Sequence, residues 1–398
     1  MEIKEFKELL SRRMLVLDGA MGTMLQRYPL GEDDFRGMRF ASHSTRLSGC
    51  NDILCLTRPD VVKEIHKQYL DAGADIISTD TFNANAVSMA DYALDGVPGL
   101  IREINRVGAS LAKEASAEAP CRCWGGHALV AGSIGPTNKS ATMSPDVDDP
   151  AARNITYSQL YSAYFDQVCG LLEGGVDILL FETVFDTLNL KAGLAAAQEA
   201  MKECGREVPV MVSATVSDKS GRTLSGQTLP AFATSIDEFS FVATLGLNCS
   251  FGPKDIIPHL RELDNNTSCF ISVHPNAGLP DALGRYDVDP DRFIRELSPV
   301  FKEELANIVG GCCGTAPEHI AALRKAVDAA KPHRAYRLEP ALRVSGLERV
   351  EVRPENNFLV VGERCNVAGS RKFLRLIKEK KYDEALAIAA KQVADGAM

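Results

Sequence analysis

The sequence lacks an apolar run long enough to span a bilayer, and its first residues lack the apolar core of a secretion signal. Residues 1–13 instead alternate charged and apolar side chains, as a short amphipathic helix does. The chain also has fewer basic than acidic residues, and its 398 residues carry a net charge of -9. That balance argues against nucleic acid or an acidic membrane surface as a partner. We therefore expect a cytoplasmic protein with a small substrate, no nucleic-acid partner and no membrane partner.

A glycine-rich phosphate-binding turn is also missing after the first apolar run, which argues against an open doubly wound sheet, the second candidate fold. Continuous apolar runs, with helical patterns between them, are typical of strands buried on both faces of a parallel sheet. Eight such units match a (β/α)8 TIM barrel of the α/β class, which needs roughly 250 residues before insertions. The expected strands are Met14–Ala20, Ala74–Phe82, Ala128–Pro136, Val176–Thr183, Val208–Val216, Phe241–Cys249, Cys269–Ala277 and Leu305–Cys313.

The chain divides into three parts by composition. The barrel is expected over residues 1–335, followed by a basic, irregular linker over 336–355 and the start of a second β/α domain over 356–398. In that last part, Asn357–Val361 reads as a strand and Ser370–Ala394 as helical. Four long loops of the barrel are expected at its catalytic face as substrate lids: 21–58, 137–154, 218–227 and 278–289.

Three cysteines stand where expected strands end. Cys312 and Cys313 are adjacent, and a trans peptide holds their Cα atoms about 3.8 Å apart, too close for an ordinary disulfide. With Cys249 they would hold zinc through three thiolates and leave one tetrahedral position open, as catalytic sites do. The alternative is that all three only fill space at strand ends. An iron–sulfur site is disfavoured because close cysteine runs are missing, and Cys121 with Cys123 lacks a matching second pair.

Two carboxylates also follow expected strands. Asp18 precedes a glycine-containing turn, and its side chain would either pair with an ammonium group of a ligand or cap the next helix. The exposed backbone amides of the same turn would suit the carboxylate of a ligand. Glu182 ends an otherwise apolar strand, where ligand binding competes with a structural salt bridge. Other polar residues at strand ends would either serve the site or order a loop: Asp80, Asn83, Asn248 and Asn276.

Four motifs together resemble the homocysteine methyltransferase family over Met14 to about Ala330: Asp-Gly-Ala-Met-Gly-Thr from Asp18, Phe-Glu-Thr around Glu182, Asn-Cys-Ser around Cys249 and Gly-Gly-Cys-Cys-Gly-Thr from Gly310. The resemblance implies that zinc on Cys249, Cys312 and Cys313 binds the sulfur of homocysteine. It also implies that this sulfur attacks the methyl group of methylcobalamin, giving methionine. Substrate binding is then expected from Asp18 and Glu182 for the ammonium, and from the amides of Gly19 and Ala20 for the carboxylate.

The segment Val361–Ser370 resembles the opening of the pterin-binding barrel of cobalamin-dependent methionine synthases, a branch of that family. Cys365 stands where that branch usually has threonine, and Asn366 is a candidate pterin contact. Too few residues follow to close a second barrel of roughly 250 residues. We therefore expect an incomplete second domain, with cobalamin presented by a domain or protein outside this chain and no use of methyltetrahydrofolate by this chain alone.

Two alternatives remain at this point. A relative that uses betaine or S-methylmethionine as methyl donor would keep the same barrel and zinc site. A non-catalytic binding module would use the zinc only to stabilise the barrel, and a fourth protein ligand would favour that interpretation.

Overall fold

The computed structural model describes residues 1–398 except 121, 123, 282–283, 285, 336 and 398. Cys121 and Cys123, which we did not expect to bind metal, therefore lie outside the described residues. The chain forms two compact units, the first made of residues 1–338 and 345–348 and the second of 339–344 and 349–398. None of the helices in the described part of the chain has both the length and the apolar character of a membrane span.

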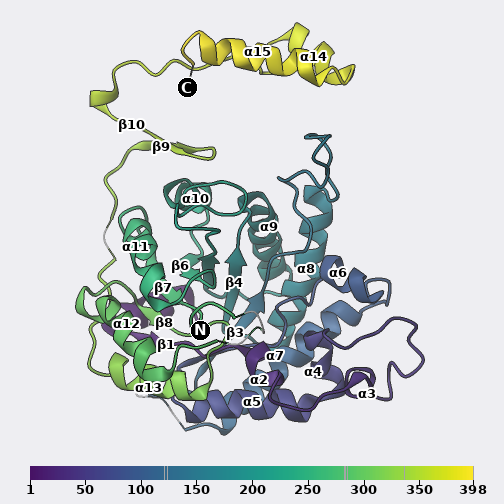
Figure 1. Cartoon of the computed structure of the whole chain (residues 1–398), viewed down its shortest axis with the longest axis vertical. Helices are drawn as coiled ribbons and strands as arrows, with labels where there is room; N and C mark the ends of the chain where they lie inside the picture. Colours follow the sequence, from purple (N-terminus) through teal and green to yellow (C-terminus); the bar gives the residue numbers. More distant parts are fainter. Residues whose placement is uncertain (121, 123, 282–283, 285, 336, 398) are drawn as a thin grey trace. The chain divides into compact units, whose positions relative to one another are not determined.

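Eight parallel strands form the core of the first unit, in the order β1-β8-β7-β6-β5-β4-β3-β2 (Figure 1). Seven lie inside the runs expected from the sequence and β4 extends one residue beyond its run, to Val184, so the (β/α)8 prediction is confirmed. The strands are shorter than the apolar runs, because those runs continue into buried loops at the strand ends. Their bounds are β1 Leu15–Val16, β2 Ile76–Ser78, β3 Leu129–Ile134, β4 Ile178–Val184, β5 Val210–Ala214, β6 Val242–Asn248, β7 Phe270–His274 and β8 Ile308–Val309.

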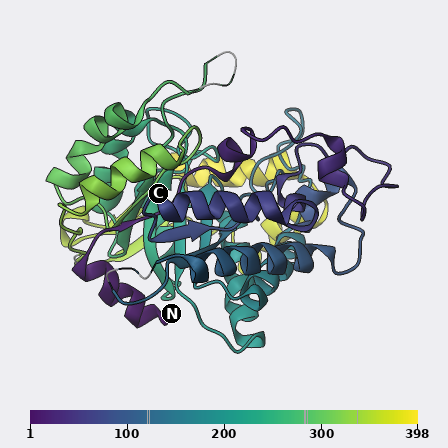
Figure 2. The same cartoon turned by 90° about the horizontal axis from the view of Figure 1, so that it is seen from below.

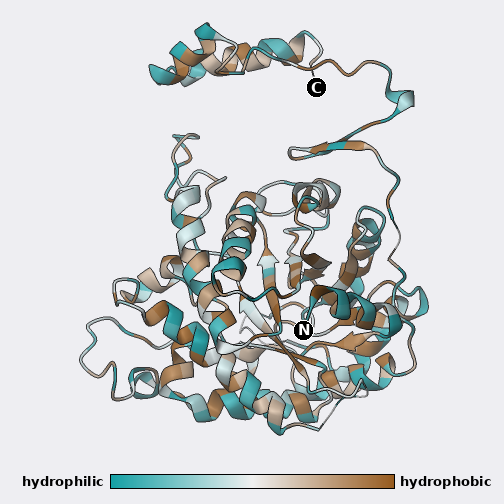
Figure 3. Ribbon diagram, turned by 180° about the vertical axis from the view of Figure 1, so that it is seen from behind, coloured by the Kyte–Doolittle hydropathy of each residue, from teal (hydrophilic) through white to brown (hydrophobic). Residues whose placement is uncertain are grey.

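Helices surround these strands and connect one to the next (Figures 1 and 2). Colouring by hydropathy shows the strands mostly brown and many helices carrying teal residues beside brown ones, as amphipathic helices do (Figure 3). The helices of the first unit are α1 Ile3–Arg12, α2 Met21–Leu25, α3 Glu32–Arg36, η1 Asn51–Ile53, α4 Leu54–Thr57, α5 Pro59–Asp71, α6 Ala86–Met89, η2 Ala90–Tyr92, α7 Leu100–Glu118, α8 Tyr157–Gly174, α9 Thr187–Glu203, α10 Leu229–Ile236, α11 Pro253–Asp264, α12 Pro290–Lys302 and α13 Pro317–Val327.

The barrel closes between β1 and β2 through Asp75, which is 2% exposed. The carboxylate of Asp75 accepts a hydrogen bond from the backbone N–H of Val16 at 2.9 Å. It also forms a salt bridge with Arg324, whose Nη1 donates to it at 2.6 Å. The backbone N–H of Asp75 in turn donates to the carbonyl of Val16 at 2.7 Å. One buried side chain thus joins the first strand, the second strand and helix α13 where the sheet meets itself.

Two expectations about irregular segments were wrong. Residues 21–58 are not one long loop, because they contain α2, α3, η1 and α4. Asn357–Val361 forms no strand, and its Phe358 is 97% exposed. An apolar run becomes a strand only where a neighbouring strand can pair with its backbone, and the described residues offer none there.

The second unit contains the helical part that the sequence predicts and a hairpin that it does not. The hairpin falls within the expected linker, and residues 345–348 of it belong to the first unit. Gln392 ties the turn before the helices to the last helix, accepting from the N–H of Arg364 at 2.6 Å and donating to the sulfur of Cys365 at 3.1 Å. The elements are β9 Leu342–Ser345, β10 Arg349–Val352, η3 Pro354–Asn356, α14 Arg371–Lys378 and α15 Tyr382–Ala394.

Replacing Asp75 by alanine should lower the free energy of unfolding by about 3 kcal/mol, because the largely buried Arg324 would lose the more buried of its two carboxylate partners and the N–H of Val16 would lose its acceptor. Urea denaturation of Asp75→Ala beside wild type measures this loss. Asp71→Ala, which removes an exposed carboxylate four residues away, is the matched control and should change stability by less than about 0.5 kcal/mol. Equal stability of Asp75→Ala and wild type would contradict the role of Asp75 in closing the barrel.

Candidate active site

The three cysteines meet at the carboxyl ends of neighbouring strands. Cys249 directly follows β6, while Cys312 and Cys313 follow β8, and β7 lies between these two strands. Both cysteine segments are fixed to the carboxyl end of β7, because Cys249 N–H donates to the carbonyl of His274 at 3.3 Å and Cys312 N–H to that of Pro275 at 2.8 Å. Parallel register therefore brings residues more than sixty positions apart into one cluster.

The sulfur atoms of Cys249, Cys312 and Cys313 all lie within 4.8 Å of one another, and those of Cys249 and Cys313 are 3.8 Å apart. Sulfurs bound at about 2.3 Å to one tetrahedral ion would be about 3.8 Å apart. The donor set thus fits a thiophilic ion such as zinc. Among the described His, Cys, Asp and Glu side chains, this is the cluster that could hold a metal, and it offers three ligand atoms.

The thiols of the cluster differ in pKa. Hydrogen bonds from Cys249 and Cys312 lower the pKa of Cys313 to about 3, and the hydroxyl of Tyr286 contributes in the same direction. Hydrogen bonds with Cys249 and Cys313, together with burial, raise the pKa of Cys312 well above its usual value. The cluster by itself therefore favours one thiolate, and ionising all three requires a cation between them.

The backbone at these strand ends is unusual. Thr183, Cys249 and Ser250 have φ of 57°, 58° and 57°, in the left-handed region that residues with a Cβ rarely adopt. Such conformations cost of order 1–3 kcal/mol each and concentrate at functional sites. On the other side of the cluster, a Cβ on Gly310 would lie 2.7 Å from the Cβ of Leu17, so glycine allows β8 and β1 to approach.

A cavity of about 430 Å³ opens beside the cysteines and is also lined by Asp18 and Glu182. Asp18 is 3% exposed, and its carboxylate accepts from Ser78 N–H at 2.8 Å and from Ser78 Oγ at 2.9 Å. Burial raises the pKa of Asp18 to about 8 in spite of these bonds, and the charge of Glu182 adds to the effect. Asp18 is therefore poised to ionise when a cationic group enters the cavity, and it does not cap a helix, since α2 begins after Ala20.

Glu182 lies on β4, and its carboxylate accepts from Ser133 Oγ at 2.6 Å. Burial raises the pKa of Glu182 to about 7, and the nearby Cys313 acts in the same direction. The structural alternative of a salt bridge is not seen, because no Lys or Arg among the described residues forms an ion pair with Glu182 within 4.0 Å. The structure thus brings Asp18 and Glu182 into one cavity beside the thiols.

Gly19 and Ala20 line the same cavity. The N–H of Ala20 already has an acceptor, since it donates to Thr315 Oγ1 at 3.3 Å. A substrate carboxylate would have to replace that hydroxyl. The N–H of Gly311 donates to the carbonyl of Asp18 at 3.1 Å, which joins the Cys312 loop to the turn that carries Asp18.

Several lining residues were missed by sequence reasoning. Ser78 and Ser133 lie at or near the carboxyl ends of β2 and β3, and their hydroxyls donate to Asp18 and Glu182, but a serine in an apolar run gives no distinct signal. His274 is buried, and burial lowers its pKa to about 3, so it faces the cavity as a neutral ring. The cavity also includes Asp52, whose pKa burial raises to about 6.

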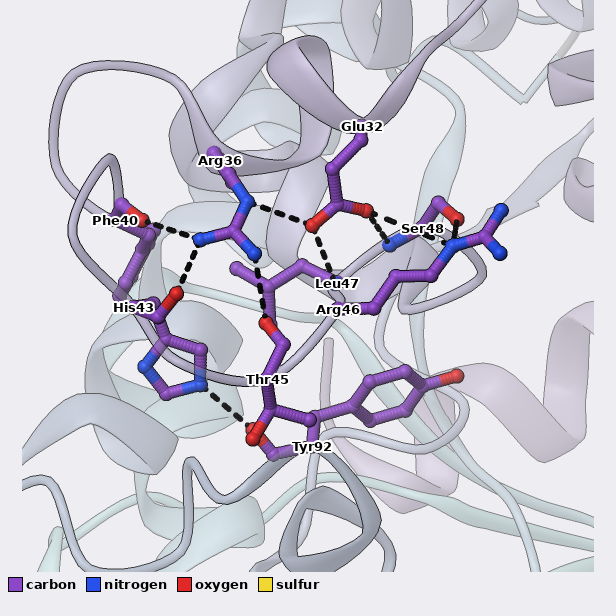
Figure 4. Close-up of polar contacts among 9 residues, drawn as sticks. All are labelled: Glu32, Arg36, Phe40, His43, Thr45, Arg46, Leu47, Ser48 and Tyr92. Atoms are coloured by element: carbon purple, nitrogen blue, oxygen red, sulfur yellow. Dashed lines mark hydrogen bonds and ion pairs between the residues drawn. The ribbon is translucent and has the colours of Figure 1, made fainter.

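The wall that carries Asp52 is held by a polar cluster in the segment before it (Figure 4). Glu32 accepts from the backbone N–H of Leu47 at 2.9 Å and of Ser48 at 2.7 Å. Arg36 pairs with Glu32 at 2.7 Å and donates to backbone carbonyls of the same segment. The resulting bonds lower the pKa of Glu32, chiefly through Leu47. They order the chain that leads into η1, where Asn51 and Asp52 face the cavity.

Asn366 belongs to the second unit, where it is exposed and its side-chain oxygen accepts from the N–H of Ala368 at 3.0 Å. This bond orders a turn before α14. The pterin contact expected from the sequence therefore stays a prediction.

Solved structures with a similar fold include the homocysteine methyltransferase MmuM from Escherichia coli. Its metallated form is 24% identical with a TM-score of 0.59, and the match covers 80% of this chain and 98% of that one. The oxidised form is 23% identical with the same TM-score, covering 78% of this chain and 95% of that one. At this identity the likeness shows a shared fold.

Membership of a family comes from the sequence itself. The profile of the homocysteine S-methyltransferase family matches residues 15–327, which include all eight strands, the three clustered cysteines and both cavity carboxylates. The match spans most of the chain, and its limits agree with the barrel. The chain belongs to the homocysteine S-methyltransferase family.

Proposed function

We propose that this chain is a zinc-dependent methyltransferase that converts homocysteine to methionine with methylcobalamin as the methyl donor. The observation that carries the proposal is the position of three thiols and two buried carboxylates in a single cavity of a homocysteine S-methyltransferase barrel. In this proposal Cys249, Cys312 and Cys313 hold the metal. When bound, zinc would supply a position at which a thiol is deprotonated at neutral pH and so becomes a nucleophile.

The chain's own residues orient the amino acid. Asp18 and Glu182 bind the ammonium group, which stabilises their ionised forms against the burial that raises their pKa values. The amides of Gly19 and Ala20 receive the carboxylate, with Thr315 Oγ1 displaced from Ala20. Ammonium and carboxylate are thus fixed on one side of the cavity, so that the thiol of homocysteine points toward the cysteines.

The sulfur of homocysteine then attacks the methyl carbon of the donor. A sulfur–carbon bond forms, the carbon–cobalt bond breaks, and its electron pair stays on cobalt, which leaves methionine and cob(I)alamin. A metal held by the three cysteines would lower the pKa of the substrate thiol, whose proton would pass to solvent, so no side chain of the cavity would be required as a general base. Because methylcobalamin is far larger than a homocysteine molecule, it would be presented at the mouth of the barrel by another domain or protein.

The division of the chain is part of the proposal. Residues 1–335 are the homocysteine barrel, 336–355 the linker and 356–398 the beginning of a pterin-binding domain, with Asn366 as a pterin contact. The two helices α14 and α15 and the turn held by Gln392 support a separate second part.

Asp18→Asn and Glu182→Gln should each weaken homocysteine binding about ten- to a hundredfold and leave the metal content unchanged, because a charge-assisted bond to the ammonium is lost. Titration calorimetry with homocysteine, beside metal analysis, measures both. Wild-type affinity should rise between about pH 6 and pH 9 as Glu182, with a pKa of about 7, and Asp18, with a pKa of about 8, ionise, and each variant should lose part of that rise.

Glu207→Gln is the control for these variants, since Glu207 is exposed outside the cavity and its loss should not alter the affinity. Unchanged homocysteine affinity in both Asp18→Asn and Glu182→Gln would refute their assignment. Loss of the metal from either variant would instead make that carboxylate part of the metal site.

Methylcobalamin, betaine and S-methylmethionine should be supplied in turn to the zinc-loaded protein with homocysteine, and methionine measured in each reaction. We expect methionine from methylcobalamin, with cob(I)alamin seen by its absorption spectrum, and none when Cys312 is replaced by alanine. Methionine from betaine or S-methylmethionine alone would replace the proposed donor by that one. Zinc binding without methionine from any donor would favour the non-catalytic module.

A further inference from the structure

Asn248, the last residue of β6, makes contacts that the proposed chemistry does not yet use. It is 1% exposed and directly precedes Cys249. Its side-chain oxygen accepts from the N–H of Thr183 at 2.9 Å and from Ser213 Oγ at 2.7 Å. Its side-chain nitrogen donates to Thr183 Oγ1 at 2.9 Å and to the sulfur of Cys312 at 3.8 Å. Both ends of the amide are therefore fully used.

The orientation of this amide follows from its partners. The backbone N–H of Thr183 can only donate, so the atom of Asn248 that faces it has to be the oxygen. The NH2 group then faces Cys312, and a sulfur that carries negative charge is a suitable acceptor for it. If the amide turned over, its NH2 group would face the N–H donor of Thr183, and its oxygen would face the sulfur of Cys312 without a proton between them.

Asn248 also connects parts of the site that come from different strands. Thr183 follows Glu182 on β4, Ser213 lies on β5, and Cys312 follows β8. Thr183 and Cys249 both have the left-handed backbone conformation, and the two bonds from Asn248 to Thr183 hold that conformation in place. One side chain thus fixes the position of a thiol ligand and the backbone beside the ammonium-binding carboxylate.

We propose that Asn248 is a positioning residue that stabilises the Cys312 thiolate through an N–H···S hydrogen bond and holds Glu182 in register with the metal cysteines. The inference rests on the proposed function, since the thiolate matters only if a metal binds. A hydrogen bond to a ligand sulfur stabilises its charged form and orients it. Loss of such an outer partner typically costs ten- to a hundredfold in metal affinity.

The test compares two variants that divide the bonds of this amide. Asn248→Asp keeps both acceptor contacts but loses the donors to Thr183 Oγ1 and to the Cys312 sulfur, and it places a carboxylate oxygen beside that sulfur. Thr183→Val loses the bond to Thr183 Oγ1 and leaves the N–H···S contact intact. Ser213→Ala removes one acceptor contact and controls for a general loosening of the strand ends.

Zinc affinity should be measured by competition with a chelator, and the thiolate-to-metal absorption band by loading cobalt in place of zinc. We expect Asn248→Asp to bind zinc about ten- to a hundredfold more weakly and to shift the cobalt band, while Thr183→Val and Ser213→Ala stay within about threefold of wild type. If Asn248→Asp does not fold, Asn248→Ala removes the same N–H···S hydrogen bond and should weaken zinc binding in the same way.

Hydrogen exchange of the metal-free proteins tests the other half of the role. The amide of Thr183 should lose protection in Asn248→Ala and keep it in Ser213→Ala. Zinc affinity and a cobalt band equal to wild type in a folded Asn248→Asp would overturn the inference alone. A wild-type protein that binds no zinc would overturn the proposed function, and the inference would fall with it.

Discussion

Electrostatic repulsion among three sulfurs is the constraint on which this site depends. Cys249, Cys312 and Cys313 lie within 4.8 Å of one another, and the bonds among them favour a single thiolate, with the pKa of Cys313 lowered and that of Cys312 raised. Ionising the other two is unfavourable without a positive charge between them. The donor atoms of this cluster fit a thiophilic metal, and in the proposed function a substrate thiol would meet the charge of that metal.

The barrel supplies this arrangement through its register. Strands β6, β7 and β8 are neighbours, so that the loops that follow β6 and β8 are both hydrogen-bonded to the carboxyl end of β7. Gly311 then joins the Cys312 loop to the carbonyl of Asp18, and Asn248 joins Cys312 to Thr183. The thiol cluster and the two cavity carboxylates are consequently parts of one connected structure. A displacement of either strand end would disturb both.

The sequence predicts the barrel and the thiol cluster because both depend on strong local signals. Continuous apolar runs mark buried parallel strands, and the carboxyl ends of such strands meet at one face, which suffices to bring Cys249 near Cys312. The bonds of Asn248 could not be predicted, since they join residues some sixty-five positions apart through side-chain geometry. The strand expected at Asn357–Val361 failed for a related reason: an apolar pattern does not reveal whether a partner strand is present.

X-ray absorption at the zinc edge tests the central claim most directly, because it counts the sulfur atoms around the metal. The zinc-loaded protein should show three sulfurs near 2.3 Å and one lighter ligand, and saturating homocysteine should raise the count to four. Methionine, which lacks a thiol, is the control and should leave three. A count that stays at three with homocysteine bound, or four sulfurs already present without it, would contradict an open catalytic position on these cysteines.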